Sequence, residues 1–363
     1  MFVQRLKIKD LSPGMVLDDF IYNSCGAVLL PKGTILTDDH LELLQSWGVV
    51  YTIKNSSSDI ILNRYKTPSK EHKKETEENK IALKEKYTNT KERVTSFMDE
   101  VKNSDKLNEE KVKEIGEVTD ELLTYTLSTT DYASLINQMK KKDSYTYQHS
   151  VNVAIYSSLM GKWLNYDNEN MKKLGIAAVL HDIGKMKVPD EILNKPDKLT
   201  KEEFDEIKKH TKHGYNITLN SQELDDYIAL AVLQHHERTD GSGYPMGVDD
   251  KRIYRFAKII AIADVFDAIT SERCYEGRYS PFDALKEIRN EAFKTLDPKI
   301  ALLFINNLMS FFIGAEVILN TGEKGKIVYF NERDLNNPII KVDEEVIDLS
   351  LEEDISLVDV LAF

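Results

Sequence analysis

The stretch HHERTDGSGYP, residues 235–245, starts with a histidine doublet and continues into a segment rich in glycine. An apolar run from Tyr227 precedes it, so we expect a helix that ends at the doublet and delivers both imidazoles to one place. Gly241 and Gly243 permit backbone conformations that a side chain would forbid, which indicates a tightly turned loop. The stretch therefore predicts a helix, a structured loop and a histidine-rich site beside them.

Histidines gather around this stretch in a way that is typical of a metal site. Six of the chain's eight histidines lie between His149 and His236. Neutral imidazole and carboxylate groups are the ligands that Mn, Fe and Zn sites use. The candidate metal ligands are His149, His181, Asp182, His210, His235, His236 and Asp264. One His–Asp pair with outlying histidines and a late aspartate can supply two metals, and two close metals suit the cleavage of phosphate esters.

Two further polar residues lie close to these candidates. His213 follows His210 by three residues, and we expect it to support the site or face solvent rather than to bind metal. Asp267 follows Asp264 by three residues, and we expect it to orient a ligand or cap a nearby backbone.

Residues 113–312 have a helical pattern throughout. Residues 171–180 predict a short helix that ends at His181-Asp182. Thr200 and Glu203 form a capping box for the helix that carries His210. Residues 256–269 are almost continuously apolar and predict a buried central helix. Its Asp264 must then be paired or metal-bound, because an isolated buried charge is costly.

The two ends of the chain differ from this helical region. Residues 1–60 predict a small β-rich domain, and residues 313–363 predict a second β-rich segment with strands at 315–319, 325–330, 339–342 and 346–349. Residues 61–112 are rich in Lys, Glu, Asn and Ser, so we interpret them as a charged, solvated helical linker. Their mixed charge signs disfavour a membrane-binding helix.

Composition narrows the class of protein. The net charge of −13 disfavours nonspecific DNA binding, since no basic excess is present to neutralise phosphates. An anionic substrate remains compatible, because bound divalent metals dominate the field inside a site. Cys25 and Cys274 are far apart in sequence, which disfavours a disulfide framework. We find neither a signal peptide nor an apolar run of ~20 residues, so we expect a cytoplasmic protein with no membrane span.

The doublet stretch resembles the HD-GYP family, because residues 235–245 match HHExxDGxGYP at every fixed position. HDIGK at 181–185, TYQHSVNVA at 146–154 and ADVFDAITSER at 263–273 are similar to further motifs of the same family, in the same order. The resemblance covers residues 110–312. It implies a mainly α protein: an all-helical HD-superfamily catalytic domain at 113–312, flanked by small β-rich N- and C-terminal segments.

The resemblance also implies a metal-dependent phosphodiesterase that hydrolyses cyclic di-GMP, with two divalent metals, Fe or Mn. Asp182 would bridge them. His149, His181 and Asp264 would serve one metal, and His210 and His235 the other, with His236 beside them. Some members bind a third metal through a glutamate four residues before the first histidine. Tyr145 occupies that position here, so we expect two metals.

Catalytic and substrate-binding roles follow from the same resemblance. Lys185 would stabilise charge on the phosphoryl oxygens, so we assign catalysis to Lys185 and Asp182. Tyr244 and Arg273, with Lys185, would contact the cyclic dinucleotide, and an arginine offers a bidentate fork for phosphate or a guanine edge. Relatives usually carry a second basic residue three positions after this arginine, where this chain has Glu276. The loop Gly243-Tyr244-Pro245 is a candidate surface for a protein partner, and a homodimer is left open.

The expected reaction uses a hydroxide activated by the two metals, which opens the ring by in-line attack to give pGpG, and a second round gives GMP. Two other functions stay open. A one-metal HD nucleotidohydrolase is disfavoured by the extra ligands His210, His235 and His236. A catalytically weak cyclic-dinucleotide receptor is disfavoured by the complete ligand set. The residues do not distinguish cyclic di-GMP from the hybrid cyclic GMP-AMP.

Overall fold

The computed structural model divides the chain into two compact units. The first comprises Met1–Ile81 and Asn306–Leu361, and the second comprises Ala82–Ile305. The structure describes residues 3–7, 11–15, 21–22, 28–30, 36–37, 41, 51–55, 70–102, 104–128, 135–136, 139, 147–271, 281–331, 334–343, 345–352 and 354–360.

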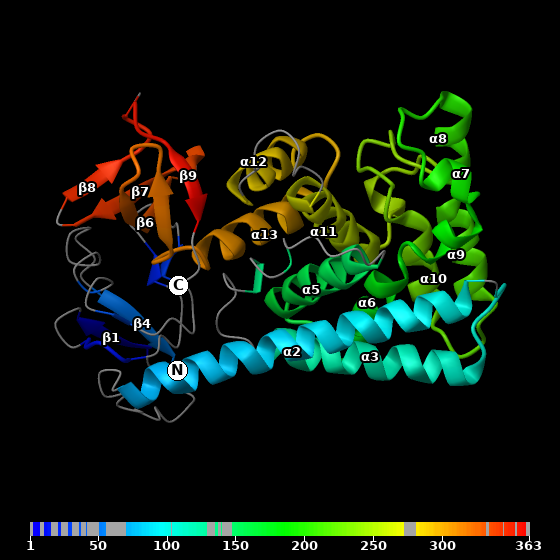
Figure 1. The fold of residues 1–363 in the computed structure, drawn as a ribbon, viewed down its shortest axis with the longest axis horizontal. Coiled ribbons are helices and arrows are strands. Elements are labelled where there is room, and N and C mark those ends of the chain that lie inside the picture. The colour runs from blue at the N-terminus through cyan, green and yellow to red at the C-terminus, as the bar shows by residue number, and fades with distance from the viewer. Residues whose placement is uncertain are drawn as a thin grey trace. The chain divides into compact units, whose positions relative to one another are not determined.

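Helices build the second unit (Figure 1). They are α3 (Glu109–Ser128), α5 (Gln148–Trp163), α6 (Asn168–Leu180), α7 (Asp190–Leu193), α8 (Lys201–Lys208), α9 (His210–Leu219), α10 (Asp226–Gln234), α11 (Arg255–Ser271) and α12 (Pro281–Glu291), with short 3-10 helices η2 (Ile183–Lys187) and η3 (Asp250–Arg252). Two more helices, α2 (Lys70–Val101) and α13 (Pro298–Ser310), have residues in both units. All the named strands belong to the first unit, so the predicted mainly α class with β-rich ends is confirmed.

The helices α5 and α11 form the core of the second unit. Both are buried around most of their circumference, as expected of helices without a continuous polar face. The ring of Tyr156 on α5 meets the ring of Phe266 on α11 edge to face at 4.9 Å, and Phe304 lies 5.1 Å from Phe266. The predicted buried central helix at 256–269 is therefore confirmed.

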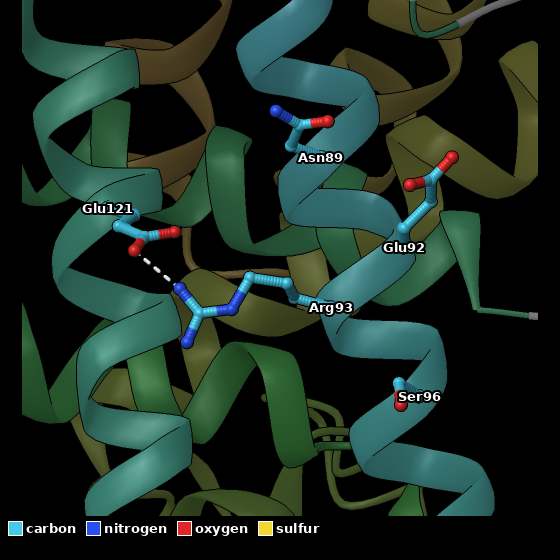
Figure 2. Close-up of a pocket in the computed structure, with 5 residues that line it drawn as sticks. All are labelled: Asn89, Glu92, Arg93, Ser96 and Glu121. Carbon is cyan, nitrogen blue, oxygen red and sulfur yellow. Dashed lines mark hydrogen bonds and ion pairs between the residues drawn. The ribbon is translucent and has the colours of Figure 1, made fainter.

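The interpretation of residues 61–112 as a solvated linker is wrong for the part from Tyr87 onward. Val94, Phe97 and Met98 of α2 are fully buried. They are spaced as one helix face, but the charged residues around them mask this stripe in the composition. Arg93 of α2 pairs with Glu121 of α3 across a polar groove that is also lined by Asn89, Glu92 and Ser96 (Figure 2).

The first unit contains antiparallel sheets. The largest has the order β8-β7-β6-β5-β9, from β5 (Glu316–Leu319), β6 (Lys324–Asn331), β7 (Asp334–Val342), β8 (Glu345–Asp348) and β9 (Leu357–Val360). In addition, β1 (Val3–Lys7) pairs with β4 (Tyr51–Asn55), and β2 (Ile21–Tyr22) pairs with β3 (Val28–Leu30).

The strands β5 to β8 overlap the predicted strands at 315–319, 325–330, 339–342 and 346–349, whereas β9 was not predicted. Residues 336–338 lie inside β7, where the pairing with β6 shifts register between Tyr329 and Asn331. A register shift gives Pro338 a place in the strand, because proline cannot donate to a regular ladder.

Helix ends in the second unit carry most of the predicted signals. α6 begins after Asp167, whose carboxylate accepts from the Asn170 amide at 2.8 Å, and it ends at Leu180 as predicted. The capping box of Thr200 and Glu203 is present at the start of α8. That helix ends at Lys208, however, so the expectation that it carries His210 is wrong.

Gly184 joins η2 to α9 by direct backbone contact. A Cβ at this position would collide with the carbonyl oxygen of His210 and the amide nitrogen of Gly214. The absent side chain therefore lets the turn after Asp182 lie against the start of α9. Within the described part of the chain, no helix is both long and apolar enough to cross a membrane.

We expect Gly184→Ala to destabilise the protein by about 1–3 kcal/mol, the usual cost of adding a methyl group where no space exists. Gly116→Ala on α3 is the control, because its Cβ would meet Lys172 side-chain atoms at an ordinary 3.6 Å. Alanine there should stabilise the helix by up to about 1 kcal/mol. Urea unfolding measures both changes, and equal effects of the two substitutions would refute the tight η2–α9 contact.

Candidate metal centre

Five helix termini and the interior of one helix bring the seven predicted ligands together. His149 lies in the first turn of α5, His181 follows α6, and Asp182 precedes η2. The remaining four are His210 at the start of α9, His235 and His236 after α10, and Asp264 within α11. The C-terminal end of α6 therefore positions the pair His181-Asp182, and the C-terminal end of α10 positions the pair His235-His236.

The ligands form two groups. One contains His149, His181 and Asp264, and the other contains Asp182, His210, His235 and His236. Within each group, one ligand atom of every residue lies within 4.8 Å of the others. Each group has the size and the donor types that a divalent transition-metal ion requires.

The Asp182 carboxylate lies between the two groups. Its Oδ1 is 3.4 Å from Nε2 of His210 and 3.9 Å from Nε2 of His235. Its Oδ2 is 3.3 Å from Nε2 of His181 and 3.7 Å from Nε2 of His149. Each oxygen thus faces imidazoles from a different group.

Backbone carbonyls fix the orientation of three imidazoles. Nδ1 of His181 donates to the Ala178 carbonyl at 2.7 Å, and His210 and His235 make the same bond to the carbonyl three residues earlier, each at 2.8 Å. A ring that donates from Nδ1 presents an unprotonated Nε2 on its other side, as a metal ligand must. All three Nε2 atoms face Asp182.

The donor atoms fit a bound metal. His181 Nε2 and Asp182 Oδ1 are buried and have no hydrogen-bond partner among the described residues. Buried polar atoms without partners are rare in folded proteins because each forfeits its solvation. A cation between these atoms would satisfy both.

Electrostatics favour the protonation states that metal ligation needs. Burial lowers the pKa of His210, that of His235 strongly, and that of His236 to about 3. Burial alone would raise the pKa of Asp182, but the ammonium of Lys185 beside it holds that pKa well below its ordinary value. Neutral imidazoles beside an ionised carboxylate are the forms that bind metal.

His149 differs from the other histidines in its surroundings. Burial would lower its pKa, but hydrogen bonds to Asp264 at 3.1 Å and Asp267 at 2.7 Å raise it to about 10. The two carboxylates therefore favour a positive charge on the His149 ring. A metal ion bound at Nε2 would supply that positive charge in place of a proton. Asp267 contacts a ligand from behind, as the sequence predicted for it.

Lys185 and Tyr244 lie at the centre. Nζ of Lys185 is 2.6 Å from Oδ2 of Asp182, and the ring of Tyr244 lies 4.7 Å from the ring of His236. His213 belongs to neither ligand group. Arg273, Glu276 and Tyr145 fall outside the described residues.

Sequence reasoning missed how the loop after the doublet is held. The buried carboxylate of Glu237 accepts from the amides of Met246 at 2.7 Å and Val248 at 3.1 Å. Gly241 has a φ of +79°, a backbone conformation that side chains disfavour, as the sequence predicted for this glycine. Gly243 has a different reason, because a Cβ there would collide with backbone atoms of His236, Glu237 and Arg238.

The region that contains this centre is similar to known proteins. Residues 133–300 match the family described as HD domain. The chain is 34% identical over 227 residues to cyclic di-GMP phosphodiesterase PA4108 of Pseudomonas aeruginosa. The aligned region covers 62% of this chain and 55% of the relative. It is 35% identical over 179 residues to 3'3'-cGAMP-specific phosphodiesterase 1 of Vibrio cholerae, covering 49% of this chain and 41% of the relative.

A solved structure shares the fold. The HDG"Y"P protein Bd1817 from Bdellovibrio bacteriovorus superposes with a TM-score of 0.51 at 16% identity, covering 85% of this chain and 99% of that one. This chain spans about half the length, or less, of the curated relatives that it matches.

We expect His181→Ala to weaken divalent-metal binding by more than about tenfold. Even residues that only orient a metal ligand typically cost about 10–100-fold in metal affinity when they are changed. His213→Ala, a histidine of α9 outside both groups, should leave it unchanged. Titration of metal-free protein with Mn²⁺ measures both. Equal affinity in the two variants would remove His181 from the ligand set.

Proposed function

We propose that this chain, whose residues 133–300 match the family described as HD domain, is a metal-dependent phosphodiesterase that hydrolyses cyclic di-GMP to pGpG, GMP or both. The observation that carries the proposal is the Asp182 carboxylate, which is only 10% exposed and whose two oxygens face two separate groups of imidazoles. Relatives named cyclic di-GMP phosphodiesterase support the substrate class.

The proposed centre holds two divalent metals, Fe or Mn. His149, His181 and Asp264 would hold one, His210 and His235 with His236 would hold the other, and Asp182 would be shared by both. Tyr145, at the position of the third-metal glutamate in some relatives, supports two rather than three. When bound, such a pair supplies an activated water and neutralises charge on the phosphodiester.

The protein's own residues orient and stabilise the reacting phosphate. The ammonium of Lys185 lies beside Asp182, and 36% of that side chain is exposed, so it can reach a phosphate oxygen at the centre. Positive charge held there stabilises the negative charge that grows during attack. Tyr244, next to His236, forms one wall for the dinucleotide, and Arg273 binds a more distant part of it.

Two alternatives predict different outcomes in solution. A one-metal nucleotidohydrolase would not need His210 and His235, whose Nε2 atoms lie 3.3 Å apart beside Asp182. A receptor without turnover would not need a complete ligand set. Because three relatives are named as specific for 3'3'-cGAMP, that dinucleotide is the second candidate substrate.

The test is turnover by protein loaded with Mn²⁺ or anaerobic Fe²⁺, with products separated by chromatography. We expect pGpG or GMP from cyclic di-GMP at a higher kcat/KM than from 3'3'-cGAMP. Asp182→Ala should retain less than about a tenth of the rate, a loss above ~1.4 kcal/mol. Binding of cyclic di-GMP without products would identify a receptor, and hydrolysis of nucleoside phosphates alone would identify a nucleotidohydrolase.

We expect Lys185→Ala to lower kcat chiefly, because its ammonium would act mainly in the transition state. Lys187→Ala is the control, since that lysine pairs with Asp105 at 2.9 Å and should leave kcat unchanged. Steady-state kinetics on metal-loaded proteins measures both. A silent Lys185→Ala would exclude the proposed catalytic role.

We expect Arg273→Ala to raise KM for cyclic di-GMP with metal content unchanged, because a residue that binds substrate and transition state equally affects KM. The same kinetic assay with metal analysis measures it. A fall in kcat at constant KM would contradict the assignment.

A further inference from the structure

We propose that Tyr87 on α2 is a positioning residue of the metal centre, acting through Asn152 and Asp267 on His149. The inference rests on the proposed metal-dependent function. It concerns a residue far from the ligand motifs in sequence, in the segment whose composition is typical of a linker.

A continuous series of hydrogen bonds joins the four residues. The Tyr87 hydroxyl donates to Oδ1 of Asn152 at 2.8 Å. Nδ2 of Asn152 donates to Oδ1 of Asp267 at 2.8 Å. Oδ2 of Asp267 is 2.7 Å from Nδ1 of His149. We call this series the Tyr87 relay.

The relay has one direction, which Tyr87 sets together with the acceptors on the other side of Asn152, the Asp267 carboxylate and the Met139 carbonyl at 3.4 Å from Nδ2. An asparagine side chain offers either an oxygen or an N–H to a given neighbour, and its partners decide which. Because the Tyr87 hydroxyl needs an acceptor, the Asn152 oxygen faces it and the N–H₂ group faces Asp267. A flipped amide would bring its oxygen against the Asp267 carboxylate, which is repulsive.

Burial makes the relay consequential. Tyr87 is 5% exposed, and Asn152 and Asp267 are each 1% exposed. Water therefore has little access to replace a lost hydrogen bond, and a buried polar group left without its partner is costly. Loss of the Tyr87–Asn152 hydrogen bond should therefore allow Asn152 to move or rotate, and Asp267 would lose the partner that positions its carboxylate.

His149 is the ligand whose orientation this would change. Nδ1 of His181, His210 and His235 is held by backbone carbonyls, whereas Nδ1 of His149 is held by the Asp267 side chain. Partners on the far side of a ligating histidine fix its tautomer and aim its other nitrogen. Here that nitrogen lies 3.1 Å from Asp264 and 3.7 Å from Asp182.

The experiment compares Tyr87→Phe with Tyr125→Phe by titrating metal-free protein with Mn²⁺ and following the free-ion signal in electron paramagnetic resonance. Tyr125 is a matched control, because it is buried, its ring centroid is 6.4 Å from that of Tyr87, and it is not a member of the relay. We expect Tyr87→Phe to weaken binding roughly two- to tenfold, the worth of one hydrogen bond, and Tyr125→Phe to leave it unchanged.

A second pair of variants separates the relay from a general packing effect. Asp267→Asn keeps the volume but presents an N–H to His149, which reverses the tautomer, and should weaken Mn²⁺ binding about 10–100-fold. Adding Tyr87→Phe to Asp267→Asn should then cause no further loss, because both act on one path.

Either of two results would overturn the inference: equal Mn²⁺ affinity in Tyr87→Phe and Tyr125→Phe, or a Tyr87→Phe effect that persists in full beside Asp267→Asn. Neither measurement needs substrate. A protein whose Mn²⁺ affinity depends on the relay as predicted, but which does not cleave cyclic di-GMP, would refute the proposed function alone. A wild-type protein that binds no Mn²⁺ would refute both.

Discussion

A largely buried carboxylate organises this site. Asp182 is surrounded by four imidazoles and one ammonium, and one of its oxygens has no hydrogen-bond partner in the described part of the chain. An ionised carboxylate in such surroundings is costly unless positive charge compensates it. The neutral imidazoles of His210 and His235 supply lone pairs instead of charge, so a cation on each side of Asp182 accounts for the arrangement.

The rest of the second unit serves to hold these atoms. Helix ends carry all the ligands except Asp264, and the last turns of α6, α8 and α10 offer the carbonyls that orient His181, His210 and His235. The backbone contact at Gly184 brings the start of α9 against the turn after Asp182. His149 is held differently, through Asp267 and Asn152, by a tyrosine of α2, a helix that begins in the first unit.

Much of this architecture could be predicted from the sequence, because strong local signals coincide with it. The apolar run at 256–269 has no polar face and is buried, and the prolines at 281 and 298 mark the starts of α12 and α13. All seven predicted ligands converge. Other features depend on tertiary contacts that composition hides. The buried stripe of α2 is sparse within a charged segment, Pro338 is accommodated by a register shift, and the Glu237 carboxylate binds amides that lie nine and eleven residues later.

The central claim is that Asp182 bridges two metals, and anomalous diffraction at the manganese or iron absorption edge tests it most directly. Crystals of the metal-loaded protein should show two fully occupied metal sites, one at each Asp182 oxygen, with His181 beside one and His210 beside the other. A single metal, or a third metal at full occupancy, would contradict the account.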